Sequence, residues 1–324
     1  MKALLLKETN QPLAFDDCPE PEAGPGQVIV DLKAAALNRR DFWITQGMYP
    51  GVQAPCILGS DGAGVASATG QEVIICPSID WGDDPAAQQE SYRILGMPDH
   101  GTFAERIAVA EGQVAAKPAH LSWAEAAALP LAGLTAFRAL FTQGRLQSGQ
   151  TVLVTGIGGG VATFALQFAV AAGAKVLVTS SSAGKIERAV ACGAIAGANY
   201  REDGWAKALG QAHGPIDLVI DSAGGDGYND LMEIVKAGGR IVNYGATTGP
   251  PRKLDLFKLF WKQLHLIGST MGSPAEFASM VGFVNERKIK PIVDQIAPLA
   301  EGSEVVAAMA ASPQFGKLVL EIGG

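Results

Sequence analysis

The chain has 324 residues, 48% of them hydrophobic, and carries a formal net charge of −7 with four cysteines. This length exceeds the usual size of a single core, so we expect two domains. The acidic balance and the absence of any Lys/Arg-rich block disfavour a nucleic-acid or anionic-membrane role, so we expect no nucleic acid and no membrane as partners, and a small molecule instead.

The expected location is the cytoplasm. The apolar run within residues 1–10 is too short for a signal sequence, and no apolar stretch is long enough to span a membrane. Cys18, Cys56, Cys76 and Cys192 lie far apart without a C-x-x-C pair, a pattern typical of buried, reduced thiols rather than of a disulfide framework or a zinc cluster.

The first 118 residues are rich in short strands separated by Pro/Gly turns. One short helix interrupts them at 41–47, with Asn38 placed as its N-cap and Asp41 in its first turn. The expected strands are 2–6, 27–37, 62–66, 72–76 and 103–109.

An α/β half follows. A helix at 123–129 leads through Pro130 into a second helix at 132–140, where we place the start of this half. Its expected strands after the segment 151–182 are 217–221, 240–245 and 265–270. From Pro274 onward, helices at 276–287 and 301–311 alternate with strands. Periodicity does not decide whether this tail extends the sheet or returns to the first domain.

Residues 151–182 predict one strand-helix-strand unit with a glycine-rich turn. Glycines at 156, 158, 159 and 160 allow a tight turn and a close approach to a ligand, and the next helix presents free N–H groups to a phosphate. A literal G-x-G-x-x-G pattern fails, because Val161 or Thr163 stands where the last glycine is required. Together with the strands that follow, the turn predicts a dinucleotide site.

The whole chain resembles the medium-chain dehydrogenase/reductases, and specifically their zinc-independent, quinone-oxidoreductase-like branch. The motifs that carry the resemblance stand in the family's order: ALNRRDFWITQGMYP, LGSDGAGVA, HGTFAERIAV, LPLAGLTAFRAL, TGIGGGVATFALQFA, RIVNYGATTG and FGKLVLEI. The resemblance implies an α/β protein with a GroES-like β domain at 1–120, to which 266–324 return, and a doubly wound parallel-sheet Rossmann domain at 121–265.

The resemblance also bears on metals. Zinc-dependent members hold the catalytic zinc by a Cys matching Asn38, a His matching Ser60 and a Cys matching Leu131. None of these three residues supplies the thiolate or imidazole that zinc requires. The segment matching the structural zinc lobe holds only Cys76, and a lone His100 is more often a satisfied polar residue than a ligand. We expect no bound metal.

The cofactor expected is NADP(H). The strand ending at residues 179–182 reads Thr-Ser-Ser-Ser, without the Asp or Glu that an NAD enzyme generally places there. Relatives that use NADP carry a Ser, a Lys and a Tyr at positions matching Ser180, Lys185 and Tyr200. The alternative is that Ser181 and Ser182 only start a helix and that Lys185 is solvated.

The resemblance implies further cofactor contacts, although the glycine turn departs from it at Ile157 and Ala162, which leaves the geometry of the phosphate loop open. The full cofactor-binding set is Thr135, Gly158, Gly159, Gly160, Val161, Ser180, Ser181, Lys185, Tyr200, Asn243, Gly245, Ser269, Met271, Gly272 and Lys317.

Hydride transfer to a carbonyl compound builds negative charge on oxygen, which preorganised donors must stabilise when no metal does so. The resemblance places the segments of five donor residues around the nicotinamide, namely Asn38, Arg39, Arg40, Tyr49 and Ser60, and among them we expect Asn38 and Tyr49 first. The alternatives are structural: Asn38 only caps its helix, the two arginines pair with Asp41 or Asp61, and Tyr49 only packs.

The sequence therefore predicts an NADPH-dependent reductase of a quinone or an α,β-unsaturated carbonyl compound. Two alternatives stay open, namely a zinc-type alcohol dehydrogenase activity and a non-catalytic NADPH-binding protein. A serine hydrolase is excluded, because LGSDG around Ser60 lacks the first glycine of the required elbow and has no evident partner His. A homodimer is expected, because relatives often pair through the edge of the Rossmann sheet.

Overall fold

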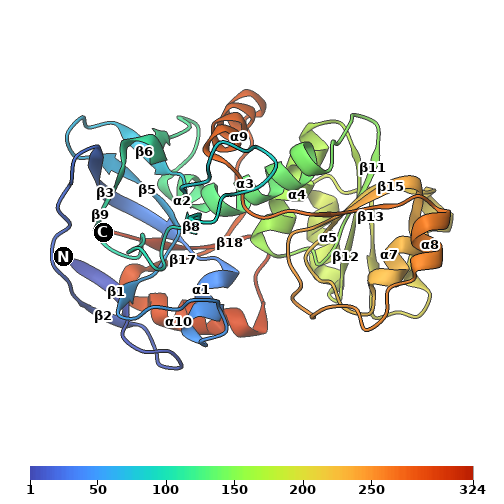
Figure 1. Ribbon diagram of the computed structural model, residues 1–324, viewed down its shortest axis with the longest axis horizontal. Coiled ribbons are helices and arrows are strands. Elements are labelled where there is room, and N and C mark those ends of the chain that lie inside the picture. Colours follow the sequence, from blue (N-terminus) through green and yellow to red (C-terminus); the bar gives the residue numbers. More distant parts are fainter. Residues whose placement is uncertain (324) are drawn as a thin grey trace. The chain divides into compact units, whose positions relative to one another are not determined.

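A computed structural model describes residues 1–323 and divides the chain into two compact units (Figure 1). Unit 1 consists of Met1–Leu134 and the described part of the segment that starts at Gly272. Unit 2 consists of Thr135–Met271. Within residues 1–323, no helix has the length and apolar character needed to cross a membrane.

Unit 1 is built mainly on antiparallel strand pairs. Its largest sheet has seven strands in the order β10-β6-β5-β3-β18-β17, with β9 also paired to β3; a second sheet has the order β2-β1-β4, and β7 pairs with β8. The strands are β1 Lys2–Leu6, β2 Ala14–Asp17, β3 Gln27–Ala36, β4 Cys56–Ile57, β5 Asp61–Ala66, β6 Glu72–Ile75, β7 Ser78–Ile79, β8 Arg93–Ile94, β9 Arg106–Ala110, β10 Val114–Ala116, β17 Val293–Pro298 and β18 Lys317–Glu321. The helices are α1 Arg39–Thr45, α2 Trp123–Ala128, α9 Pro274–Arg287 and α10 Gly302–Ala308, with single 3-10 turns at Glu111–Gln113, Leu299–Glu301 and Met309–Ala311.

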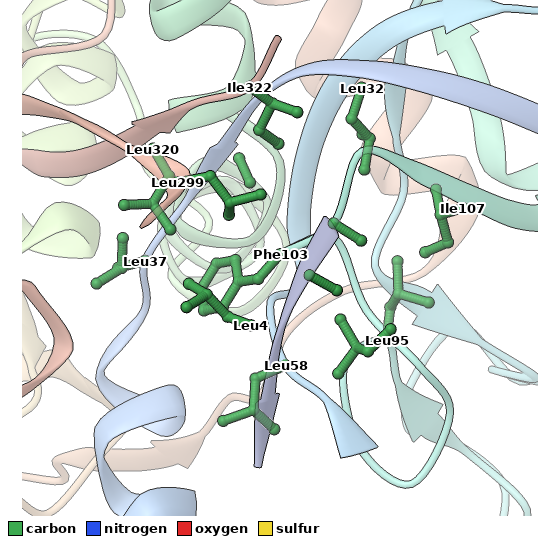
Figure 2. Close-up of a cluster of buried hydrophobic side chains, with 14 of the residues drawn as sticks. Leu4, Leu32, Leu37, Leu58, Leu95, Phe103, Ile107, Leu299, Leu320 and Ile322 are labelled. Carbon is green, nitrogen blue, oxygen red and sulfur yellow. The ribbon is translucent and has the colours of Figure 1, made fainter. Parts of the chain in front are cut away.

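The C-terminal tail returns to unit 1, which answers the question that periodicity left open. Strand β18 pairs antiparallel with β3, with Val319 opposite Ala36. Figure 2 shows the resulting core, in which Leu299 and Leu320 from the tail lie with Leu4 and Phe103 from the first part of the chain. All four side chains are at most 6% exposed, so burial of this apolar surface ties the tail to the N-terminal strands.

Unit 2 contains a six-stranded parallel sheet in the order β13-β12-β11-β14-β15-β16. The strands are β11 Thr151–Val154, β12 Lys175–Ser180, β13 Ala196–Asn199, β14 Ile216–Asp221, β15 Val235–Asn243 and β16 His265–Gly268. The helices are α4 Gly160–Ala171, α5 Ala183–Ala191, α6 Trp205–His213, α7 Tyr228–Ile234 and α8 Leu256–Trp261. Helix α3, Pro130–Phe137, continues into a π-helical segment at Arg138–Gln143.

The register of this sheet explains how its helices pack. Leu153, Leu177, Val219 and Ile241 stand opposite one another on four adjacent strands, so their side chains line one face. They form one buried cluster with apolar residues of α6 and α7. The order of the strands places β11 and β14 at the centre. Because β11 and β12 are parallel, the loops that follow them emerge at the same edge of the sheet, where parallel α/β sheets bind ligands.

The unit boundaries differ from the sequence expectation at two places. Residues 121–134 belong to unit 1, because α2 packs on β3, β5 and β18. Residues 266–271 belong to unit 2, because β16 pairs with β15 and completes the parallel sheet. Both differences have the same cause: tertiary pairing, rather than local composition, assigns a short segment to a unit.

Candidate active site

The glycine-rich turn between β11 and α4 has the conformation that a phosphate site requires. Gly156 and Gly158 have φ angles of 61° and 129°, which favour glycine, and Gly159 occupies the N-cap position of α4. A Cβ atom added to Gly159 would meet no other atom within 4 Å, so there is open space beside this backbone. The amides at the start of α4, from Gly160 and Val161, have no partner within the helix and are available to a phosphate.

Four predicted cofactor residues meet at the ends of β12 and β13. Ser180 Oγ accepts a hydrogen bond from Ser182 N at 3.2 Å, and Tyr200 N donates to Ser180 O at 3.3 Å. Ser182 caps α5 by accepting from Lys185 N at 3.4 Å, which places Lys185 in the first turn of the helix that starts after Ser181. The structure thus brings the backbones of Ser180, Ser181, Lys185 and Tyr200 to one corner, and strand β12 ends there on serines and not on a carboxylate.

A buried hydrogen-bond network lies at the carboxyl ends of the central strands. The Asp221 carboxylate, 1% exposed, accepts from Thr155 Oγ1 at 2.6 Å, from Gly224 N at 2.9 Å and from Asn243 Nδ2 at 2.8 Å. Tyr228 Oη donates to Asn243 Oδ1 at 2.5 Å, and burial raises the pKa of Tyr228 to about 12. Sequence reasoning missed Asp221, although it ends the strand expected at 217–221.

Asn243 also anchors the neighbouring predicted residues. Its side-chain amide binds Tyr228 through Oδ1 and Asp221 through Nδ2. Its backbone carbonyl oxygen accepts from Ser269 N at 2.8 Å. The Ser269 hydroxyl is buried and has no hydrogen-bond partner among residues 1–323, so a donor and an acceptor remain available there. Gly245 lies beside Ser222, whose carbonyl oxygen would stand 3.3 Å from an added Cβ atom.

The last predicted residues of the nicotinamide end lie where the chain passes between the units. Thr135 and Met271 are both 5% exposed, and Thr135 Oγ1 lies 3.8 Å from Met271 Sδ. Met271 has a φ angle of 43°, which is uncommon for a residue other than glycine. Gly272 belongs to unit 1, where its carbonyl accepts from Ser78 Oγ at 2.5 Å.

The catalytic candidates all lie in unit 1, around the N-terminus of α1. Asn38 is the N-cap residue, and the Asp41 side chain accepts from Asn38 N at 2.7 Å. The Asn38 side chain does not cap the helix. Its Nδ2 donates to Asp61 Oδ2 at 2.9 Å, and its Oδ1 accepts from Lys317 Nζ at 2.7 Å.

Lys317 and Asp61 form a buried ion pair, with 2.8 Å between Nζ and Oδ2 and side-chain exposures of 3% and 0%. The other carboxylate oxygen of Asp61 accepts from Leu131 N at 2.7 Å, and the carbonyl oxygen of Asp61 accepts from Thr102 Oγ1 at 2.7 Å. The resemblance places Lys317 among the cofactor contacts. In the structure its ammonium donates to Asn38 Oδ1 and Asp61 Oδ2, which belong to its own unit. Sequence reasoning assigned Asp61 no such role and considered it only as a partner of arginine.

Asp41 is a second buried acid in this region. Its side chain is completely buried, and Oδ1 has no hydrogen-bond partner among the described residues. Burial raises the pKa of Asp41 to about 6, although the nearby guanidinium of Arg40 acts in the opposite direction.

The remaining catalytic candidates are engaged within unit 1. Arg39 donates to Met309 O and to Ser312 Oγ, each at 2.5 Å. Arg40 donates to Ser60 Oγ at 2.7 Å, and its guanidinium carbon lies 5.0 Å from the centre of the Tyr49 ring. Ser60 is fully buried, and its hydroxyl proton is directed to Leu95 O at 2.7 Å. Arg39 and Ser60 therefore hold the fold together here, and neither arginine has a hydrogen-bonded ion pair with Asp41 or Asp61.

The groups around Asp61 do not fit a catalytic zinc. Around Asp61 stand the amide of Asn38, the backbone N–H of Leu131 and the ammonium of Lys317, and none of these groups is a zinc ligand. No group of three or more His, Cys, Asp or Glu residues within 1–323 is arranged to hold a metal ion. His100 has a structural role, since Ile57 N approaches its Nδ1 at 3.2 Å.

Known proteins resemble the chain over its whole length. The alcohol dehydrogenase GroES-like domain family matches residues 24–119, and the zinc-binding dehydrogenase family matches residues 160–286. A zinc-type alcohol dehydrogenase-like protein, YogA, of Leptosphaeria maculans is 37% identical, over 96% of this chain and 95% of its own length. A quinone oxidoreductase of Pseudomonas aeruginosa is 30% identical, over 95% of each chain.

The fold of a solved structure is also similar over the whole length of the chain. A crystal structure described as an NAD-dependent alcohol dehydrogenase superposes with a TM-score of 0.94 at 36% identity and covers 100% of both chains. The antiparallel sheets of unit 1 correspond to the GroES-like family match, and the parallel sheet of unit 2 is of the Rossmann type. The chain therefore belongs to the medium-chain dehydrogenase/reductase superfamily, as an oxidoreductase with a GroES-like domain and a Rossmann-like domain.

Proposed function

We propose that the protein is an NADPH-dependent reductase of a quinone or an α,β-unsaturated carbonyl compound, and that it works without zinc. The observation that carries the proposal is the set of groups where zinc-dependent relatives hold their metal. Asn38, Ser60 and Leu131 stand there, and Lys317 supplies the positive charge beside Asp61. Of these residues, Asn38 retains a donor for an oxygen atom, since one N–H of its Nδ2 is directed to Asp61 and the other is not, and none of the four supplies a thiolate, imidazole or carboxylate to zinc.

The preference for NADPH is supported by the corner at the ends of β12 and β13. An adenosine 2′-phosphate requires donors and a positive charge, which Ser180, Ser181, Lys185 and Tyr200 can supply together. The strand end lacks the carboxylate that would repel this phosphate. The similar crystal structure described as NAD-dependent makes the opposite preference the alternative that must be tested.

The chemistry assigned to the residues of unit 1 is stabilisation of charge. A bound NADPH would supply a hydride. When an enone gains a hydride at its β carbon, the electron pair of the C=C bond moves toward the carbonyl oxygen, and the α carbon then takes a proton from water. Asn38 Nδ2–H and the Tyr49 hydroxyl are the donors we assign to that oxygen, because Arg39 and Ser60 are engaged elsewhere.

The proposal also includes the location and assembly of the protein. We place it in the cytoplasm with a small-molecule substrate. We further propose a homodimer, because Phe257, Phe260 and Trp261 of α8 are 61–82% exposed and β16, the next strand, is at the edge of its sheet. These aromatic side chains expose about 450 Å² per copy. Doubling this area in a symmetric pair and adding backbone pairing along β16 reaches the low end of stable interfaces.

The proposed function is tested by titrating the purified protein with NADPH and NADH, and then measuring oxidation of the preferred nucleotide with 1,4-benzoquinone, 2-cyclohexen-1-one and an aldehyde. Ethanol with NADP⁺ tests the zinc-type alcohol dehydrogenase alternative. We expect tighter binding of NADPH, turnover of the quinone or the enone, and an Asn38→Ala variant that is at least about 100-fold slower. Tighter binding of NADH would contradict the cofactor assignment. Saturable NADPH binding without turnover of any compound would favour a non-catalytic NADPH-binding protein.

A further inference from the structure

The side-chain amide of Asn38 is fixed by two groups that cannot exchange roles. Lys317 is only a donor, and it engages Oδ1 at 2.7 Å. The Asp61 carboxylate is an acceptor, and it engages Nδ2 at 2.9 Å. Reversing the amide would set Oδ1 against the carboxylate and Nδ2 against the ammonium, so only one orientation is compatible with both neighbours.

This arrangement leaves one donor of Asn38 available. The Nδ2 group carries two protons, of which one is directed to Asp61, and the described residues provide no acceptor for the other. Asn38 is 7% exposed, so the remaining N–H lies in surroundings of low dielectric, where a hydrogen bond to a developing charge is stronger than in water. The ammonium on Oδ1 draws electron density through the amide and strengthens that N–H as a donor.

We infer that Lys317 is a positioning residue for the reduction: together with Asp61 it orients and polarises Asn38, whose free Nδ2–H then binds the oxygen of the substrate. This inference rests on the proposed function, because it takes Asn38 as the donor to the substrate. It differs from the sequence expectation, in which Lys317 contacts the cofactor. It also assigns a function to the pairing of β18 with β3, which carries Lys317 into unit 1 close to Asn38.

The first test is Lys317→Met, with Lys33→Met as the control because Lys33 is an exposed lysine of the same sheet. We expect the kcat of Lys317→Met to fall about 10- to 100-fold, while the Kd for NADPH changes less than about twofold. Lys317→Arg keeps a donor-only cation and should retain kcat within about fivefold of the wild type. A tenfold rise in the Kd for NADPH with unchanged kcat would overturn the inference in favour of a cofactor contact.

The second test is a double-mutant cycle with Asn38→Ala. If Lys317 acts through Asn38, then Asn38→Ala/Lys317→Met is no slower than Asn38→Ala alone, within about twofold. If Lys317→Met lowers kcat by the same factor in both backgrounds, Lys317 does not act through Asn38 and the inference fails.

Lys317→Met leaves the Asp61 carboxylate buried without its counter-charge, so the variant can fail to fold. Lys317→Met/Asp61→Asn removes both charges and keeps the volume nearly constant, and it should unfold at a temperature close to that of the wild type. Its kcat should stay at least about tenfold low, because an amide at position 61 can both donate and accept and no ammonium is left on Oδ1, so neither neighbour then imposes one orientation on the amide of Asn38. Full recovery of kcat in this folded variant would show that Lys317 only neutralises Asp61.

Failure of the inference and failure of the proposed function give different results. An active wild type with a slow Asn38→Ala and an unaffected Lys317→Met retains the function and refutes the positioning role. A wild type that binds NADPH but reduces none of the compounds refutes both.

Discussion

Replacing the buried acid of α1 tests how the structure treats charge in the region of Asn38. Asp41 is completely buried, and its pKa of about 6 compares with an ordinary value of 3.8. This difference corresponds to about 3 kcal/mol, since each pKa unit is worth about 1.4 kcal/mol. Because the pKa is raised, the folded protein holds a proton between pH 4 and pH 6 that the unfolded chain releases. The contribution of Asp41 to stability is therefore fully present below about pH 3.8 and is lost as the pH rises from there through about 6.

Asp41→Asn removes this titration. In the wild type, Asn38 N donates to the Asp41 carboxylate at 2.7 Å, and the asparagine of the variant keeps a side-chain oxygen that can accept this hydrogen bond. We expect the free energy of unfolding of the variant, minus that of the wild type, to rise from its value at pH 4 by about 2.5 kcal/mol at pH 7.5, because part of the total of about 3 kcal/mol is already lost at pH 4. Urea unfolding at five or six pH values measures this difference directly. Taking the difference cancels acids such as Asp217 and Asp226, whose lowered pKa values favour stability at higher pH.

The matched control is Asp230→Asn, since Asp230 is an exposed acid in the first turn of α7. It makes the same change of charge without the burial, so its difference curve should be nearly flat. An Asp41→Asn curve that is also flat from pH 4 to 7.5 would refute the reasoning, because Asp41 would then titrate as it does in the unfolded chain.

Three further predictions concern unit 2. In fluorescence titrations, Lys185→Ala should raise the Kd for NADPH about tenfold and leave the Kd for NADH unchanged, because it removes a positive charge proposed to bind the 2′-phosphate. Lys207→Ala, at an exposed lysine, is the control. Equal effects of Lys185→Ala on both nucleotides would contradict the assignment. Gly158→Ala should raise the Kd of both nucleotides at least about tenfold, since φ is 129° there and a side chain strains the phosphate turn. Gly112→Ala, in open space within unit 1, should leave both Kd values unchanged. Unaltered binding by Gly158→Ala would argue against a phosphate site in this turn. Phe257→Ser/Trp261→Ser should halve the mass seen by light scattering, because both side chains belong to the exposed face of α8; a monomeric wild type, or a variant that stays dimeric, would exclude the proposed interface.

Local pattern was sufficient for most of the fold. The strand-helix-strand unit at 151–182 appears as β11, α4 and β12, because alternating β-branched residues, glycines and a period near 3.6 act within a few residues of one another. The corner formed by Ser180, Ser181 and Lys185 was predictable for the same reason. The resemblance to a family then supplied the two-domain organisation that periodicity left undecided.

The arrangement around Asp61 was not predictable from pattern. Lys317 lies 256 residues from Asp61 and 279 residues from Asn38 along the chain, and only the pairing of β18 with β3 brings them together. The resemblance matched Lys317 to a cofactor contact, because matching two sequences compares positions along the chain. It does not tell which side chains the lysine ammonium binds in the folded protein. For Asn38, the sequence was compatible with either of two roles, a helix cap or a catalytic donor. In the structure the backbone of Asn38 starts α1, while its side chain is left for Asp61 and Lys317.

The central claim is that donors around Asn38, and not a metal, stabilise the charge that develops during reduction. The most direct measurement is the rate of NADPH oxidation with 2-cyclohexen-1-one by protein purified through EDTA, together with the zinc content of the same sample. The account predicts an unchanged kcat in protein with less than about one zinc in ten chains, and no increase when zinc is added. Loss of activity on removal of zinc, with recovery on its return, would contradict it.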